Sequence, residues 1–183
     1  MDKVKFGIKN VHVFPIESVT AGVPTYGTPI AIPGAVSYSA SAQGDINKFY
    51  ADNIVYYQSA SNNGYEGDLT VALIPDEFYE KIFGQTPDTN GVYTEDASVE
   101  AKAFAMTFEE EGDQTGTKFV MYNCTATRPS RELNTIEDSK TPTTQALTVS
   151  SAPLESGKVM AMTSATTPAE VLTTWHESVY ISQ

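Results

Sequence analysis

Hydrophobic and polar side chains alternate with a period of two along several stretches of the chain. In residues 101–108 the alternation places Phe104, Met106 and Phe108 on one side, opposite small residues. A strand with this pattern buries its large-residue side in a core. A second alternating stretch, residues 118–127, follows a polar loop that contains glycine. The two stretches are therefore predicted to form an antiparallel hairpin.

The remaining elements are mostly strands. PDEFYEKIFG has helical signals, because it begins at Pro75, carries acids in its first turn and ends at Gly84. TTPAEVLTTW is the second helical segment, with Thr167 as N-cap of a capping box that includes Glu170. Many strands and one or two short flanking helices predict a mainly β fold, a β-sandwich or part-closed barrel. The length fits a single domain over residues 1–183. Further strands are expected at residues 3–14, 67–74, 143–150, 157–163 and 176–182.

Residues 15–45 differ from the rest because they hold four of the ten prolines. Pro24, Pro29 and Pro33 recur at short spacing, and prolines at this density oppose a central strand. A long irregular stretch inside a compact domain suggests a role with a neighbouring subunit. The segment is therefore predicted to be an extended, Pro-rich arm or loop on the surface.

The net charge of −12 is confined to the middle of the chain. Between Asp45 and Asp113 there are 15 acids and three bases, a net of −12, whereas the other residues carry eight of each. Such a surface repels the phosphates of nucleic acids, which argues against a DNA-binding function. A solvated, solubilising face is the simpler alternative.

Residues that carry catalysis or bind metals lack the spacing that those functions need. His12 and His176 are single and far apart, and Cys124 has no histidine nearby in the sequence. Phosphate-binding glycine motifs and a serine nucleophile elbow are absent from the sequence. No apolar run is long enough to cross a bilayer, and the first residues lack a secretory signal. We therefore expect a protein that is not an enzyme, has no cofactor or metal, and carries Cys124 as a small buried side chain.

The stretch FYADNIVYYQS, residues 49–59, concentrates aromatic side chains beside short polar ones. Tyr50, Tyr56 and Tyr57 with Asp52 could form a protein interface or a sugar-binding shelf. Packing in the core is the alternative for the same residues.

Five pieces of this chain, in their order and spacing, resemble the major tail (tail tube) proteins of long-tailed bacteriophages. They include FYADN, a YxxxxNxGYEGxLxVALIPxEFYxxIxG segment, and the KFxxYNxxxxRPS end of a strand. The resemblance covers most of the chain from about residue 40 onward. The matching pieces are Phe49–Asn53, Tyr57–Gly84, Ala101–Phe108, Lys118–Ser130 and Pro142–Ser150.

The resemblance implies a structural virion protein. Members of this family form hexameric rings that stack into the tail tube, through which the genome passes without specific binding. The implied partners are further copies of the chain, the tape measure protein, the tail terminator and the distal tail protein, with no membrane. The implied location is the virion tail, assembled in the host cytoplasm. The chain is expected to lack the C-terminal immunoglobulin-like domain of some members.

Three sets of residues become candidate assembly sites under this resemblance. The acidic turn between the hairpin strands is expected to be exposed, and either to line the lumen or to meet lysines such as Lys9 in the adjacent ring. The Pro-rich arm is expected to reach the next ring through Pro24, Pro29 and Pro33. The acidic turn comprises Glu109, Glu110, Glu111 and Asp113, and the expected subunit interface comprises Tyr50, Asp52, Tyr56, Tyr57, Arg128 and Arg131.

Two other functions remain open from the sequence. A tail terminator or distal tail protein would form a single ring rather than a tube. A carbohydrate-binding β-sandwich module would use the tyrosines of residues 49–59 as its binding surface.

Overall fold

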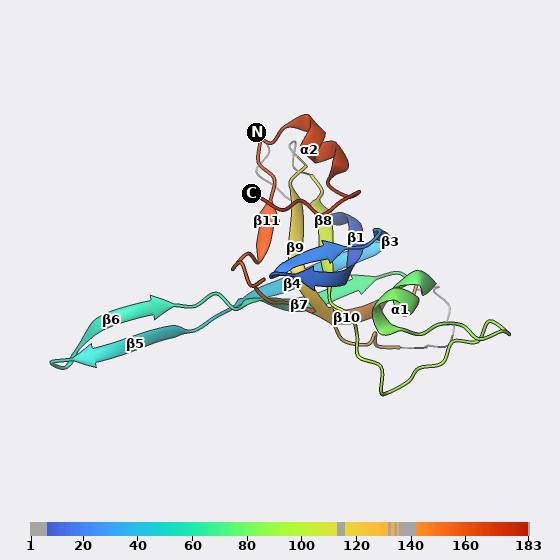
Figure 1. Ribbon diagram of the computed structural model, residues 1–183, viewed down its shortest axis with the longest axis horizontal. Coiled ribbons are helices and arrows are strands. Elements are labelled where there is room, and N and C mark those ends of the chain that lie inside the picture. The colour runs from blue at the N-terminus through green and yellow to red at the C-terminus, as the bar shows by residue number, and fades with distance from the viewer. Residues whose placement is uncertain (1–6, 113–115, 132, 134, 136–141, 183) are drawn as a thin grey trace.

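The structure, a computed structural model, describes residues 7–112, 116–131, 133, 135 and 142–182. Strands dominate these residues, and two short helices accompany them (Figure 1). The elements are β1 (Ile8–Thr20), β2 (Val23–Tyr26), β3 (Ile30–Ile32), β4 (Ala35–Gln43), β5 (Ile46–Ala51), β6 (Ile54–Ala60), β7 (Gly64–Val71), α1 (Asp76–Phe83), β8 (Phe104–Glu110), β9 (Lys118–Ala126), β10 (Gln145–Ser151), β11 (Met160–Met162) and α2 (Ala169–Thr174).

One antiparallel sheet organises the body of the molecule. Its strands follow the order β2-β1-β8-β9-β10-β7-β4, with β3 also paired to β1 and β11 to β9. Strands β5 and β6 pair only with each other and extend far from the body (Figure 1). The predicted mainly β fold with short flanking helices is therefore confirmed, as is the β8–β9 hairpin.

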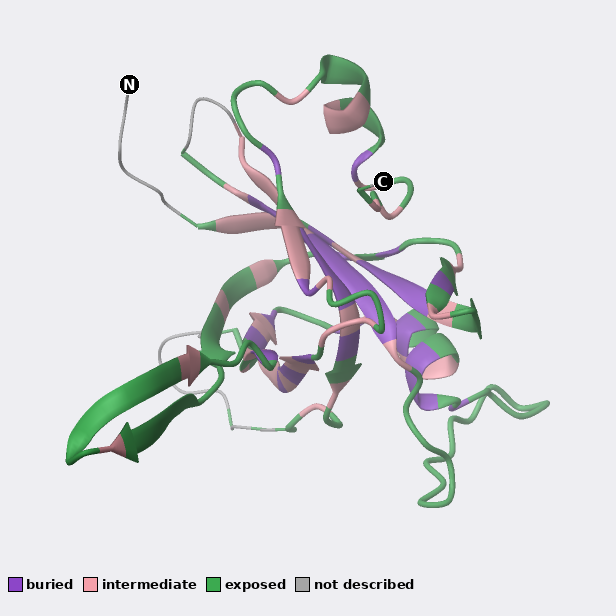
Figure 2. Cartoon of the chain, turned by 60° about the vertical axis from the view of Figure 1, so that its left-hand side comes forward, coloured by how far each residue is buried: buried purple, intermediate pink, exposed green. Residues whose placement is uncertain are grey.

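Both faces of the central strands are buried. On one face, Phe78, Ile82 and Phe83 of α1 pack against a cluster that includes Val13 and Met106. A smaller cluster on the other face contains Val120, Tyr122 and Trp175, together with side chains of the C-terminal segment. Figure 2 shows the central strands as a continuous buried block between these layers. Burial on both sides explains why β8 is buried at successive positions instead of alternating.

The two predicted helices are present, and only the first has the expected ends. α1 begins after Pro75 and ends at Gly84, whose φ of 65° is the left-handed conformation that glycine adopts at low cost. α2 begins after Pro168, and no side chain caps its first turn. The Thr167 hydroxyl accepts a hydrogen bond from the Ser164 amide at 2.9 Å. The predicted capping box is wrong because this hydroxyl closes the preceding turn instead.

Residues 15–45 are not an extended arm, and this prediction is wrong. The segment completes β1 and then forms β2, β3 and β4, all of them paired in the main sheet. Ile30 and Ile32 of β3 belong to the core. The prolines are accommodated because Pro24 lies on the terminal strand β2, whereas Pro29 and Pro33 flank β3.

The prediction of a C-terminal strand at residues 176–182 is also wrong. These residues form no strand, and Val179 and Ile181 instead pack against the cluster around Tyr122. Alternating apolar residues can cover a sheet face as well as pair at its edge, and the pattern alone does not separate the two. The strand expected at 157–163 is reduced to β11.

Gly67 allows β4 and β7 to pair closely. It lies opposite Ala40, and a Cβ atom at residue 67 would clash with the backbone of Ser39 and Ala40. Replacing Gly67 therefore forces the two strands apart.

We expect Gly67→Ala to lower the free energy of unfolding by about 1–3 kcal/mol through this overpacking. Ser41→Ala, an exposed change on the same strand pair, should alter stability by less than about 0.5 kcal/mol. Urea unfolding of both variants measures the difference. Equal midpoints for Gly67→Ala and Ser41→Ala would contradict the close approach at residue 67.

Candidate functional site

A long two-stranded hairpin projects from the body, and we call residues 44–61 the projecting hairpin. It continues β4 and β7 outward, joined at its base by the Ser61 amide, which donates to the Asp45 carbonyl at 2.9 Å. At its tip, Asp52 and Asn53 have φ values of 52° and 61°. Positive φ at both central residues is typical of the type I′ turn, whose twist matches that of a two-residue β-hairpin. The projecting element of this molecule is therefore residues 44–61, and not 15–45.

The projecting hairpin carries apolar side chains on both of its faces. Phe49 pairs with Tyr57 and Tyr50 pairs with Val55, and directly opposite residues share a face. Phe49 and Tyr50 are neighbours on β5, so these two pairs lie on opposite faces, and the register shift between them leaves Tyr56 without a directly opposite partner. Phe49, Tyr50, Tyr56 and Tyr57 are each between 61% and 71% exposed.

An exposed hairpin of this composition needs a partner. A two-stranded hairpin is at best marginally stable in water by itself. Contiguous exposed apolar side chains are typical of interaction sites. Figure 2 shows the projecting hairpin as an almost fully exposed ribbon, with no other part of the described chain beside it. The sequence identified Tyr50, Asp52, Tyr56 and Tyr57 as candidate interface residues but did not show that they lie on one projection.

The acidic turn does not have the expected exposure. Glu109 is only 9% exposed. Its carboxylate accepts a hydrogen bond from the Asn10 side chain at 2.9 Å and lies 3.6 Å from the Lys9 ammonium and 4.0 Å from that of Lys118. The prediction that Glu109 sits exposed on a hairpin tip is wrong, because β8 extends through it and lysines of two neighbouring strands neutralise it.

The other acids of the turn differ from one another. Glu110 is the partly buried last residue of β8, whereas Glu111 is exposed beyond it. Asp113 lies outside the described residues. A lumen or inter-ring role for this turn remains a prediction that the exposed part alone could fulfil.

Two histidines meet beside Glu109, which the sequence did not reveal. The rings of His12 and His176 stack with centroids 5.0 Å apart. His176 Nδ1 lies 3.0 Å from the Thr107 hydroxyl, and Nε2 lies 3.8 Å from the Glu109 carboxylate. Burial, followed by the charges of His12 and Lys118, lowers the pKa of His176 from 6.5 to about 4. His176 is thus neutral at pH 7 in the folded protein.

The histidine contact helps to hold the C-terminal segment on the sheet. Trp175, the neighbour of His176, donates its indole N–H to the Phe119 carbonyl at 3.1 Å and stacks on Tyr180. Lys118 donates to the Leu172 carbonyl at 2.9 Å. Polar contacts and the apolar cluster around Tyr122 therefore both hold the C-terminal segment against β9.

Arg128 has a partner within its own chain. Its Nε lies 2.9 Å from the Glu95 carboxylate, and its guanidinium also donates to the Asp96 carbonyl at 3.3 Å. Both side chains of the ion pair are about half exposed, so the pair stabilises the fold little. Contact of Arg128 or the exposed Arg131 with a neighbouring subunit stays a prediction.

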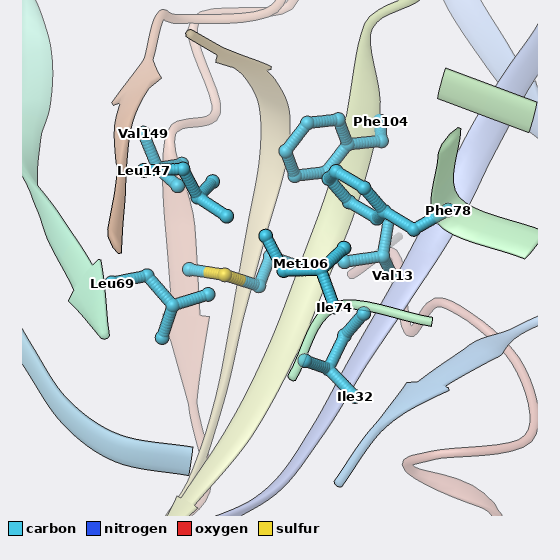
Figure 3. Close-up of a pocket in the computed structure, with 9 residues that line it drawn as sticks. All are labelled: Val13, Ile32, Leu69, Ile74, Phe78, Phe104, Met106, Leu147 and Val149. Atoms are coloured by element: carbon cyan, nitrogen blue, oxygen red, sulfur yellow. The ribbon is translucent and has the colours of Figure 1, made fainter. Parts of the chain in front are cut away.

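The described residues enclose a small apolar cavity. A cavity of about 10 Å³ lies between α1 and the sheet, and only apolar side chains, such as Val13, Phe78 and Met106, line it (Figure 3). This volume is at the lower limit for one water, and the cavity has no polar group to hold it. Cys124 is fully buried, which raises its pKa to about 12 and makes it a poor nucleophile.

The part of the chain that the structure describes lacks two further features. It contains no group of three or more His, Cys, Asp or Glu side chains placed to hold a metal ion. Neither of its helices has the length and apolar character needed to span a membrane.

A sequence model of the phage tail tube protein family matches residues 2–179. The chain belongs to this phage tail tube protein family. It is therefore a structural protein of a phage tail, as the resemblance of its five sequence pieces predicted. No curated protein matches the chain significantly.

Two solved structures are similar in shape to this tail tube protein. One is the tube terminating cap of the anti-feeding prophage, with a TM-score of 0.49 and 10% identity over 90% of this chain and 96% of that chain. The other comes from the anti-feeding prophage baseplate, with a TM-score of 0.48 and 10% identity over 91% of this chain and 99% of that chain.

The buried histidine generates a prediction about acid. Because the pKa of His176 is about 4 when the C-terminal segment is docked and 6.5 ordinarily, protonation favours the undocked segment. The contribution of His176 to docking is complete above pH 6.5 and is lost as the pH falls from 6.5 toward 4. We expect the fluorescence of Trp175, the only tryptophan, to shift to longer wavelength over this range.

His176→Gln removes the titrating group and should flatten this pH dependence while lowering the stability at pH 7. Glu170→Gln, an exposed change on α2, serves as the control and should titrate like the wild type. An unchanged acid shift in His176→Gln would show that another group controls the docking.

Proposed function

We propose that this protein assembles into stacked hexameric rings that form the phage tail tube, the conduit for genome delivery. The observation that carries the proposal is the projecting hairpin, whose two faces both carry exposed apolar side chains. A projection with one apolar face could lie against its own body, but two apolar faces require surfaces on either side. Neighbouring subunits of a stacked assembly would supply them.

The sheet supports contacts within a ring. β2 and β4 end the path of the main sheet in the described residues, so each has an edge available for pairing. Open strand edges normally allow uncontrolled association with other chains, whereas in a ring they would pair with the edges of neighbouring subunits. Head-to-tail contacts that close produce a ring, and the repeated ring-to-ring contact produces a tube. Pro24 is buried within β2, whereas the exposed Pro29 and Pro33 flank β3 and would contribute to subunit contacts, as would Arg131.

The proposed function is not enzymatic. Assembly would take place in the host cytoplasm around a tape measure protein, with the terminator and the distal tail protein at the two ends. No cofactor enters this function, and DNA passes without specific binding.

The alternatives receive less support from the geometry. A sugar-binding shelf needs its aromatic rings on one face, whereas Tyr50 points away from Phe49 and Tyr57. A terminator or distal tail protein would stop at a single ring. The number of stacked rings separates this alternative from the tube.

Substitution on the projecting hairpin tests the proposal. We expect purified wild-type protein at high concentration to form tubes in negative-stain micrographs. Phe49→Ser/Tyr57→Ser and Tyr50→Ser alter opposite faces, and each should raise the concentration needed for assembly by at least about tenfold, as expected for loss of a buried aromatic anchor.

Val92→Ser, at an exposed apolar residue of the loop after α1, is the matched control and should assemble like the wild type. Circular dichroism checks that each variant is folded. Tubes that form equally well in all three variants would refute the role of the hairpin. A wild-type protein that forms only single rings would favour the terminator or distal tail function.

A further inference from the structure

One face of the β10–β7–β4 sheet carries an ordered set of short polar side chains. The register places Ser39, Asp68 and Thr148 directly opposite one another, and such residues share a face. Their sequence neighbours on β7 and β10, such as Leu69 and Val149, point into the core, so this face points away from it. We call it the hydroxyl face, and its rows are Ser41, Glu66, Ser150 and Thr125; Ser39, Asp68 and Thr148; and Ser37, Thr70 and Ala146.

The hydroxyl face is polar and free of positive charge. Of its ten residues, seven are Ser or Thr, two are acids and one is Ala, so none is Lys or Arg. Glu66 and Asp68 are exposed, and neither forms an ion pair within the described chain. The Thr148 hydroxyl donates to the Asp68 carboxylate at 2.7 Å, which fixes one charge close to the sheet surface.

This side of the sheet is covered over β9 but uncovered over β10, β7 and β4. Over β9 the C-terminal segment covers it, with Trp175 against Val120 and Tyr122. Over β10, β7 and β4 the side chains are exposed or half-buried, and they are polar although a covered sheet face would be apolar. This part of the face is therefore suited to water.

From these observations we propose that the hydroxyl face forms the wall of the tube lumen along which duplex DNA slides, with Glu66 and Asp68 as its charges. This proposal rests on the proposed tube function. Short hydroxyl side chains remain hydrated and offer no long group to obstruct the duplex. The carboxylates repel phosphates, whereas lysine or arginine at the same positions would bind the backbone and retard it.

Assignment to Glu66 and Asp68 replaces the sequence-based choice of the acidic turn. Glu109 cannot repel DNA effectively because it is buried and lies between Lys9 and Lys118. The order of the strands also supports the lumen assignment. β4 and β7 carry the hydroxyl face, and both continue directly into the projecting hairpin. One continuous pair of strands would thus line a ring and reach its neighbour.

Charge reversal tests the lumen assignment. Tubes of Glu66→Lys/Asp68→Lys assembled with short duplex DNA should protect at least about tenfold more DNA from nuclease than wild-type tubes, and the protection should disappear at high salt. Glu100→Lys/Glu155→Lys makes the same charge change at two exposed loop acids and should protect no more than the wild type. Equal protection by both pairs, or by neither, would overturn the assignment.

Cysteine labelling tests the same face without changing its charge. Ser39→Cys in assembled tubes should react with a small maleimide but not with a long polyethylene glycol maleimide, and the isolated subunit should react with both. Thr94→Cys, on the exposed loop after α1, should react with both reagents in either state. The native Cys124 is fully buried and stays silent.

The labelling pattern distinguishes the possible failures. Reaction of Ser39→Cys with both reagents in tubes would place the hydroxyl face on the outside of the tube. Reaction with neither reagent would place it in a contact between subunits. Each result would overturn the lumen assignment but not the proposed tube function. Failure of the wild-type protein to form tubes overturns the proposed function and this inference together.

Discussion

Burial of the central strands on both faces is the constraint on which the rest of this structure depends. β8 is buried at Phe104, Ala105, Met106 and Thr107 in succession, so the sheet needs a cover on each side. α1 supplies one cover, with Phe78, Ile82 and Phe83, and the C-terminal segment supplies the other through Trp175. Each cover contributes the apolar area that a single open sheet would leave in water.

The limited extent of these covers determines what remains for assembly. The C-terminal segment covers β9 but leaves the outward face of β10, β7 and β4 in water, and that face is polar. Nothing in the described chain covers the projecting hairpin, and many of its exposed side chains are large and apolar. The two uncovered regions thus differ in chemistry, which fits a surface in contact with water for one and a surface in contact with protein for the other.

Local signals in the sequence predicted much of the fold. Periodicity predicted the β8–β9 hairpin, and a proline at one end with a glycine at the other predicted α1. The family resemblance predicted the membership that the family comparison established. Errors occurred where a distant partner decides the structure. Residues 15–45 became strands because β1 and β7 were available to pair with them, and residues 176–182 became a cover because β9 presented an apolar face.

The sequence by itself determined the β8–β9 hairpin, the position of α1, the segmental charge and the family. Only the tertiary structure decided which acidic side chains and which aromatic side chains are exposed to solvent. Glu109 is buried and accepts a hydrogen bond from Asn10, 99 residues away along the chain. Glu66 and Asp68, in contrast, are exposed on an uncovered face of the sheet. The physical reason is that alternation assigns a side chain to one of two faces but carries no information on what covers each face. That depends on contacts between segments far apart in the chain.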